Sequence, residues 1–446
     1  MKQRLKEETI IFASVFKWLI LGSVVGVITG VSTTVFVMSL NWGARIAGQA
    51  HYYWFLPLGL FLSALIIKYV TPSAQGHGAN KVIESIHKHS GKMKPLYAPI
   101  EFLRTFITLT GGGCAGKEGP SAQIGAGLAS IFADLIRFEG VDRRKLVICG
   151  ISGAFASVFG TPIAGAVFGI EVLFMGAIRY EVLLPSFVAG VISYQVSTWL
   201  GLTYFYHPIT FVPVFSELIF IKVAAAGVFF GLASFAFVEI LNLCRGVSAR
   251  IKFPLPVKGL LAGFFLAGIT ALLGNHYLGL GLDVIQAAIE GKDIPAYAFL
   301  MKSFFTGVTL GFGGHGGVGT PIFYVGATAG SAFGHFIGED GALFAAIGFV
   351  SLLAGAANTP IAASIMAVEL FGAAVAPYAA ISSVISFAVS GHRGAYPSQV
   401  IAAKKSSSIE VEIGAELLSA QPRCAYREKS FIGLLRYAAG KFRRAK

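Results

Sequence analysis

Long apolar stretches separated by short polar breaks run through almost the whole chain. The first of them cover residues 10–40, 54–70 and 96–109, and the pattern starts again near residue 218. About 20 apolar residues are enough to cross the hydrocarbon core of a bilayer as a helix. Many stretches here are shorter and interrupted by Gly or Pro, which is typical of helices that break inside a membrane protein. The pattern predicts an all-α membrane protein with broken and re-entrant helices.

The composition strengthens this prediction. Hydrophobic residues make up 55% of the 446 residues and charged residues only 13%, against about 25% charged residues in ordinary globular proteins. The 55 glycines indicate close helix contacts and broken helices. The four cysteines are scattered without metal-ligand spacing, so we expect small core residues there and no metal or other cofactor.

The net charge of +13 is concentrated near the two ends of the chain. Lysines and arginines cluster in residues 1–9 and again in residues 404–446. Because basic residues favour the cytoplasmic side of a membrane, we expect both termini in the cytoplasm. Contact with anionic lipid explains these basic ends without a nucleic-acid partner. The first apolar stretch is too long for a cleavable signal peptide and lacks a cleavage pattern.

The two halves of the chain repeat each other at an offset of about 200 residues, which is typical of transporters and channels with a site near the membrane midplane. Three anchors recur in the same order: the segments at 76–83 and 279–285, Pro120 and Pro321, and Thr161-Pro-Ile-Ala with Glu171 against Thr359-Pro-Ile-Ala with Glu369. The short, interrupted segments favour an inverted over a parallel repeat. The predicted parts are a basic N-terminus (1–9), a first transmembrane repeat (10–202), an inter-repeat loop (203–217), a second transmembrane repeat (218–404) and a basic tail (405–446).

The glycine-rich stretch 111–125 contains a lysine and a carboxylate, Lys117 and Glu118, at the start of an apolar helical segment. Pro120 fits the first turn of that helix. The spacing of Gly111 through Lys117 matches a phosphate-binding loop, but Glu118 replaces the Ser or Thr that would bind magnesium and would repel phosphate. The sequence therefore predicts an anion site at a helix N-terminus that the protein fills with its own carboxylate.

Four polar breaks, at residues 76–80, 116–120, 316–321 and 391–396, could place irregular backbone inside the membrane. Three of them precede a helix start, so their free N–H groups could converge on one anion. Taken singly, each break is also compatible with an ordinary loop outside the membrane. The repeat favours the shared site.

These breaks resemble the motifs of the CLC chloride channels and chloride/proton antiporters. Gly116-Lys-Glu-Gly-Pro120 is similar to the family's G-(K/R)-E-G-P motif, and Gly317-Val-Gly-Thr-Pro321 to its G-x-F-x-P motif. Gly76-His-Gly-Ala-Asn80 lies where G-S-G-I-P is usual, and Tyr396 matches the pore tyrosine. The resemblance covers residues 10–404 and implies the CLC fold and a homodimer with one pathway per subunit.

The resemblance also implies roles for single residues. Glu118 would be the gating glutamate, which competes with the permeating anion and moves aside when protonated; the alternative is a helix-capping carboxylate. Tyr396 would donate its hydroxyl to the anion; the alternative is an interfacial aromatic residue. The complete set of implied anion-binding residues is His77, Gly78, Lys117, Gly119, Val318, Gly319 and Tyr396.

Three positions depart from the family pattern. Gly319 stands where the family has a phenylalanine, and His77 stands where it has a serine, so an imidazole N–H could donate to the anion or point away from it. The proton-relay glutamate of the antiporters is Val172 here, although His77 or Glu181 could substitute for it. We interpret Glu171 and its repeat mate Glu369 as structural.

The sequence therefore predicts passive, channel-like chloride transport with a glutamate gate, in a bacterial inner membrane. Exchange of chloride or fluoride for protons along a non-standard path is the alternative, because the family's fluoride exporters also lack the relay and alter the serine motif. Those exporters usually lack the pore tyrosine, so Tyr396 favours chloride. The predicted partners are small anions, protons, lipid and a second copy of the chain. The last residues, 430–446, could form an amphipathic surface helix or a disordered tail.

Two other functional classes fit less well. A secondary transporter of organic solutes would need a pocket for a carbon skeleton, whereas the sequence offers backbone N–H groups and few charges. A membrane-embedded enzyme would need a metal site or a nucleophile with its base, and the nine histidines are dispersed. We expect a transport protein without enzymatic activity.

Overall fold

The computed structural model describes residues 2–47, 52–70, 78–209, 213 and 216–425. Apolar stretches form helices because a helix satisfies its own backbone hydrogen bonds. The first half contains α1 (Lys2–Ala47), α2 (Leu56–Tyr69), α3 (Ala79–Lys88), α4 (Tyr97–Thr110), α5 (Glu118–Leu135), α6 (Gly140–Phe159), α7 (Pro162–Glu171) and α8 (Leu183–Trp199). The second half contains α9 (Glu217–Arg250), α10 (Leu255–Leu273), α11 (Leu282–Ile289), α12 (Ala298–Gly311), α13 (Gly319–Phe336), α14 (Gly341–Ala357), α15 (Pro360–Phe371) and α16 (Ala376–Val389).

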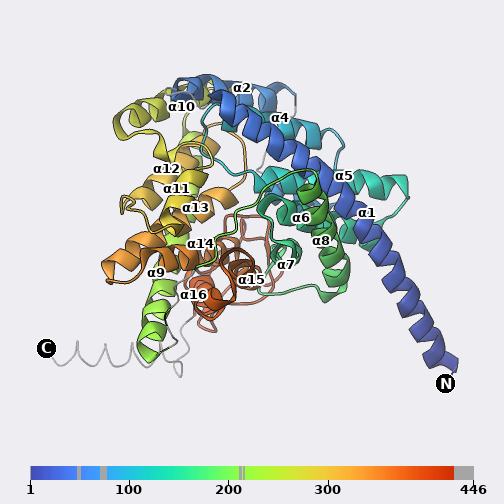
Figure 1. Cartoon of the computed structure of the whole chain (residues 1–446). Coiled ribbons are helices and arrows are strands. Elements are labelled where there is room, and N and C mark those ends of the chain that lie inside the picture. Colours follow the sequence, from blue (N-terminus) through green and yellow to red (C-terminus); the bar gives the residue numbers. More distant parts are fainter. Residues whose placement is uncertain (1, 48–51, 71–77, 210–212, 214–215, 426–446) are drawn as a thin grey trace.

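The two halves pack in the same way, helix for helix. The contacts of α1 with α8, of α5 with α6 and of α6 with α8 recur as contacts of α9 with α16, of α13 with α14 and of α14 with α16. Repeat mates also meet each other, because α2 contacts α10 and α7 contacts α15. Figure 1 shows most of the first half on the right and most of the second half on the left, with α7 and α15 near the centre.

Reciprocal hydrogen bonds show how the halves are related. The carboxylate of Glu171, at the end of α7, accepts the backbone N–H groups of Ile361 (3.1 Å) and Ala362 (2.8 Å) at the start of α15. The carboxylate of Glu369, at the end of α15, accepts the N–H groups that begin α7, at 2.9 and 2.8 Å. Each helix thus caps the free N-terminus of its mate, as a pseudo-two-fold axis requires. This is the inverted repeat of broken helices that the sequence predicts.

Within the described residues, five helical segments are long and apolar enough to cross a membrane: 3–45, 52–69, 180–199, 217–250 and 255–273. Their outer faces carry exposed apolar side chains, such as Ile20 on α1 and Leu232 on α9. Small residues pack in the interior. The shorter helices α7, α13, α14 and α15 form the centre of the protein and are largely buried.

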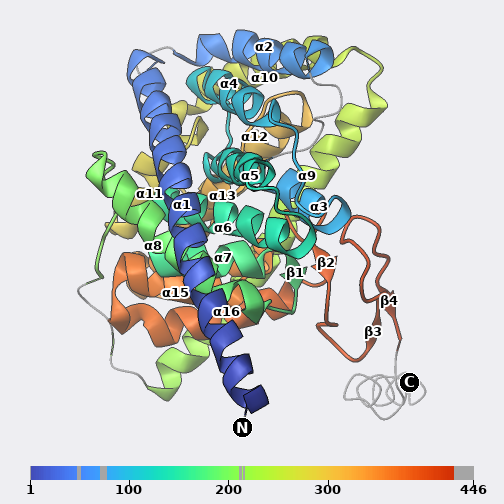
Figure 2. The same ribbon diagram turned by 90° about the vertical axis from the view of Figure 1, so that its right-hand side faces the viewer.

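The chain after α16 forms loops and short strands rather than a further helix. Strand β2 (Val400–Ile401) pairs in parallel with β1 (Phe174–Met175), and β3 (Ile409–Glu410) pairs with β4 (Arg423–Cys424) in antiparallel fashion. Figure 2 shows β1 and β2 below α3 and the β3–β4 pair at the edge of the protein. The β1–β2 pairing fixes residues just after Tyr396 to the end of α7. The segment 430–446, for which a surface helix or a disordered tail is expected, lies outside the described residues.

Candidate anion-binding site

The N-termini of α5 and α13 meet at the centre of the protein. Gly116 and Gly317, in the two glycine-rich breaks that precede these helices, exchange backbone hydrogen bonds of 2.7 Å in each direction. A side chain at Gly119 would place its Cβ 2.9 Å from the Cα of Gly317. Only glycines allow the two backbones to come this close. The breaks therefore bring two helix N-termini, with their free N–H groups, to one point.

Glu118 occupies this point. It is only 2% exposed, and Oε1 of its carboxylate accepts the backbone N–H of Gly319. Its other oxygen, Oε2, accepts the hydroxyl of Thr320 at 2.8 Å. The sequence predicts a carboxylate at the start of its own helix. The structure directs that carboxylate across the repeat to the start of α13, where a backbone N–H and a hydroxyl converge.

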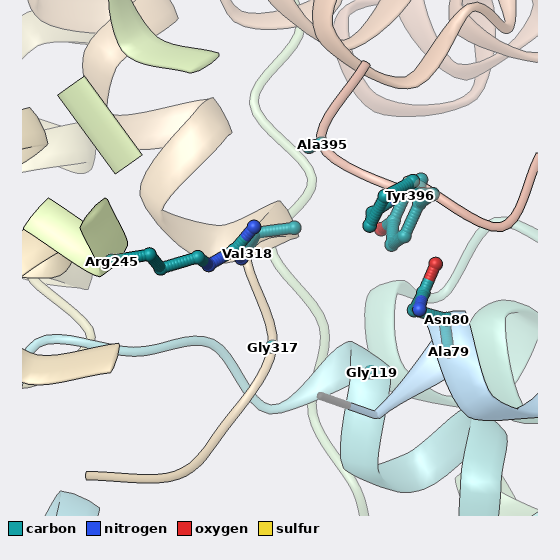
Figure 3. Close-up of a pocket in the computed structure, with 9 residues that line it drawn as sticks. Ala79, Asn80, Gly119, Arg245, Gly317, Val318, Ala395 and Tyr396 are labelled. Atoms are coloured by element: carbon teal, nitrogen blue, oxygen red, sulfur yellow. The ribbon is translucent and has the colours of Figure 1, made fainter. Parts of the chain in front are cut away.

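A cavity of about 230 Å³ lies next to the crossing of the two breaks. Its lining includes four predicted or neighbouring site residues, Gly119, Gly317, Val318 and Tyr396. Figure 3 shows Val318 and Tyr396 on opposite sides of this space, with Ala79 and Asn80 of α3 below Tyr396. Five segments that are far apart in the sequence, including α9 with Arg245, thus surround one space.

Gly78 brings the start of α3 to the same place. It has a φ of +42° and comes directly before α3, and a Cβ at this residue would lie 2.8 Å from the Cα of Gly119. Both the positive φ and the close approach favour glycine here. The preceding residue, His77, lies outside the described residues, so its predicted contact with the anion stays a prediction.

The loop with Tyr396 is held from several sides. Tyr396 is buried, and its ring packs edge-on against Phe168 at a centroid distance of 6.4 Å. The backbone N–H of Ala395 donates to the carbonyl of Ala356 at 2.7 Å, and that of Ser398 donates to Oδ1 of Asn80 at 2.7 Å. These bonds fix the tyrosine in the cavity wall, where its hydroxyl can donate to an anion.

Three residues of this region were missed by sequence reasoning. Thr320 follows Gly319 directly, but its hydroxyl could be assigned only once its partner was known. Asn80 is the last residue of the predicted break at 76–80, but its side chain was given no role, and it supports the tyrosine loop by accepting the N–H of Ser398. Arg245, on α9, is the charged residue among those lining the cavity, and in Figure 3 it extends toward Val318. Nothing in the sequence of α9 indicates that this arginine faces the site.

Two predicted positions lie apart from the cavity lining. Lys117 is half-buried; its carbonyl accepts the hydroxyl of Ser121 at 2.9 Å, and its side chain has no hydrogen-bond or ion-pair partner among the described residues. Val172, at the position of the antiporters' relay glutamate, is fully buried, and its carbonyl accepts the side-chain amide of Gln399 at 3.1 Å. In the part of the chain that the structure describes, no three His, Cys, Asp or Glu side chains gather in a way that could hold a metal ion.

This arrangement has a simple chemical consequence. An anion that enters the site needs the same hydrogen-bond donors that Glu118 now occupies. A charged carboxylate and a second anion cannot share those donors at low cost in a buried place. The site can therefore hold either the carboxylate or an incoming anion.

Known proteins match both the sequence and this fold. A family model described as "Voltage gated chloride channel" matches residues 58–391. The "Chloride/fluoride channel protein" of Pseudomonas syringae pv. tomato is 35% identical over 91% of this chain and 91% of its own length. The "H(+)/Cl(-) exchange transporter ClcA" of Yersinia pseudotuberculosis serotype IB is 27% identical, covering 79% of this chain and 80% of its own.

A solved structure agrees with the sequence matches. The crystal structure of a CLC-type fluoride/proton antiporter superposes with a TM-score of 0.81, at 27% identity, over 86% of this chain and 98% of that one. The family model covers most of the chain, including both helix breaks that meet at Glu118. The chain therefore belongs to the CLC family of voltage gated chloride channels and carries the membrane fold of these anion transport proteins.

Proposed function

We propose that this protein moves a small anion, fluoride in preference to chloride, across the membrane in exchange for protons, with Glu118 as its gate. One observation carries the proposal: the Glu118 carboxylate occupies the donors at the start of α13. In its charged form it excludes other anions. In its protonated form it gives up its charge and with it most of its attraction to the N–H of Gly319. An anion can then take its place.

The site chemistry favours fluoride. A small, strongly hydrated anion needs short hydrogen bonds from strong donors to replace its water. The N–H of Gly319 and the hydroxyl of Thr320 offer such donors side by side. The names of two relatives point the same way, since one is a chloride/fluoride channel protein and the other a fluoride/proton antiporter. The sequence alone favours chloride because of Tyr396, and this alternative stays open to the test below.

Proton exchange follows from the gate. Each opening of the site requires a proton on Glu118, so that a bound proton and an entering anion are linked in one cycle. Passive conduction of the anion is the second candidate. It is favoured by Val172, because the carboxylate that relays protons in other antiporters is missing at that position.

The test uses purified protein in liposomes loaded with potassium fluoride or potassium chloride. We expect fluoride efflux to exceed chloride efflux by about tenfold or more, and a fluoride gradient to drive protons against their own gradient. Equal efflux of both anions would refute the choice of substrate. Fluoride efflux without proton movement would refute proton exchange and support passive conduction of the anion.

The variant Glu118→Gln tests the gate in the same liposomes. We expect its anion flux to no longer respond to pH.

The wider assembly follows the family resemblance. We propose that the protein forms homodimers in a bacterial inner membrane, with both termini in the cytoplasm. The basic residues near the ends of the chain support this orientation.

A further inference from the structure

Three ionisable side chains are buried together beside the crossing of the two helix breaks. Glu101 and Arg104 on α4 are 3% and 2% exposed, and His315, in the break before α13, is 0% exposed. Ionisable groups buried inside a membrane protein are costly and usually serve its function. The gate mechanism described above uses none of the three.

Glu101 and His315 form a direct pair. Nε2 of His315 lies 2.7 Å from Oε2 of Glu101, and the backbone N–H of His315 donates to the hydroxyl of Thr108 on α4 at 3.0 Å. The second carboxylate oxygen of Glu101, Oε1, has no hydrogen-bond partner among the described residues. Oε1 of Glu101 is therefore available to accept a proton. A pair that served only to hold the helices together would not need this free oxygen. Arg104, which like Glu101 lies on α4, is a charged neighbour of both Glu101 and His315.

Both members of the pair are linked to the gate. Gln123, on the same helix as Glu118, can donate its amide N–H groups to Oε2 of Glu101 (3.3 Å) and to the carbonyl of Gly78 (3.1 Å). Gly78 in turn packs against Gly119, the residue after the gate. From the other side, His315 is two residues from Gly317, whose backbone pairs with Gly116. The pair therefore adjoins both backbone segments that hold Glu118.

The position of the pair also suits a path from one side of the membrane. The segment that enters α4 carries Lys92 and Lys94, and basic segments favour the cytoplasmic side. Glu101 lies about one turn into α4 from that segment. A proton that enters from the cytoplasm would reach Glu101 and His315 before it reaches Glu118.

We propose that the Glu101–His315 pair transfers protons between the cytoplasm and Glu118, in place of the relay carboxylate missing at Val172. In each cycle the pair takes up one proton, which passes to the Glu118 carboxylate and neutralises it. The O–H bond formed on Glu118 replaces the O–H or N–H bond that the pair loses; the pair then takes its next proton from the cytoplasm, and no other reactant is needed. This inference depends on the proton exchange proposed above.

The experiment measures the reversal potential of anion current in liposomes, with and without a pH gradient, for wild-type protein and three variants. Glu101→Gln keeps a hydrogen bond to His315 but cannot titrate. We expect it to retain fluoride flux while the pH gradient no longer shifts the reversal potential. Glu101→Asp should restore a shift. Glu369→Gln changes a half-buried carboxylate of the helix caps; it should keep the wild-type shift and so controls for general destabilisation.

Each result decides the matter. If the pH gradient shifts the reversal potential of Glu101→Gln as much as that of the wild type, the proposed proton relay is wrong. If that variant proves inactive, His315→Gln is measured in the same way, and retained flux without a shift supports the relay. Loss of flux together with the shift in both variants assigns the pair a structural role and overturns the proposal. A wild-type protein whose reversal potential ignores the pH gradient refutes the exchange mechanism itself, and the relay with it.

Discussion

At the residue scale, the proposed function rests on which group holds the donors at the start of α13. The Glu118 carboxylate now occupies the N–H of Gly319 and the hydroxyl of Thr320. Hydrogen bonds to a charged partner contribute about 1.5–3 kcal/mol each. The energy that would keep the proposed gate closed is therefore set by very few contacts, and single substitutions should change it measurably.

Thr320→Val tests the hydroxyl contact. Valine keeps the shape of threonine but cannot donate, so the charged carboxylate is held less tightly. We expect the ratio of anion flux at neutral pH to flux at acid pH to rise about tenfold, as a loss of roughly 1.4 kcal/mol implies. We compare this ratio rather than the flux itself because a change in anion affinity alters the flux at both pH values and cancels in the ratio. Thr320→Ser retains the hydroxyl and should behave as wild type; equal ratios in all three proteins would show that the hydroxyl does not restrain the gate.

Part of this site could be predicted from single residues. Glu118 could be placed at a helix start from the sequence, and the family resemblance implied the N–H of Gly319. Backbone N–H groups at a helix start are free whatever the side chains are. Thr320 and Arg245 were not, because their roles depend on which distant segment lies opposite. Glu101 and Arg104 were visible as charges inside an apolar stretch. Without a known partner, however, they could not be told from residues at the membrane boundary.

At the element scale, the broken helices are stabilised by exchanged caps. Glu171 and Glu369 neutralise the positive N-termini of α15 and α7. This agrees with the structural role expected from the sequence. Pro and Gly indicated where the helices break, but not that each half supplies the other half's cap, because that contact joins residues about 190–205 positions apart.

Glu171→Ala should destabilise the fold without changing which anion is transported. The substitution leaves the N–H of Ala362 buried without an acceptor, which costs about 1–3 kcal/mol. Thermal unfolding in detergent should show a lower midpoint than wild type, while the fluoride-to-chloride flux ratio stays the same. An unchanged midpoint would contradict the capping role, and an altered ratio would place Glu171 in the pathway.

At the scale of the whole molecule, the segment after α16 forms one wall of the site through Ala395, Tyr396 and Pro397. Lys405 donates to Oδ1 of Asn358 (2.7 Å), the carbonyl of Phe387 (2.6 Å) and the hydroxyl of Ser390 (3.0 Å). Asn358 also bonds Gln399, which lies close to Tyr396 in the chain. Burial lowers the pKa of Lys405 to about 7. The segment is thus tied to the helices by a lysine that titrates near neutral pH.

This pKa predicts how stability depends on pH. An unfolded lysine has a pKa of about 10.4, so between about pH 7 and that value the unfolded chain binds a proton that the folded chain does not. The contribution of Lys405 to the free energy of unfolding therefore rises with pH through this window and is lowest below about pH 7. The difference in unfolding midpoint between wild type and Lys405→Met should increase from neutral to alkaline pH. A difference that is constant or falls would contradict the lowered pKa.

Much of the overall architecture could be predicted from the sequence, because the internal repeat and the apolar pattern reflect constraints that a membrane imposes on any chain. The contact between the N-termini of α5 and α13 could be predicted from the sequence only in part. The repeat indicated that the two breaks face each other, but their backbone pairing at Gly116 and Gly317 depends on packing across the whole protein. The choice between exchange and conduction is still less visible in the sequence, since it depends on proton movement.

Competition between the Glu118 carboxylate and the transported anion can be measured by calorimetric titration of fluoride into the detergent-solubilised protein. Near neutral pH, Glu118→Ala should bind fluoride about tenfold or more tightly than wild type, because its donors at Gly319 and Thr320 are vacant. Acidification should tighten binding to wild type and leave the variant unchanged. Equal affinities of the two proteins at neutral pH would show that the Glu118 carboxylate does not compete with the anion.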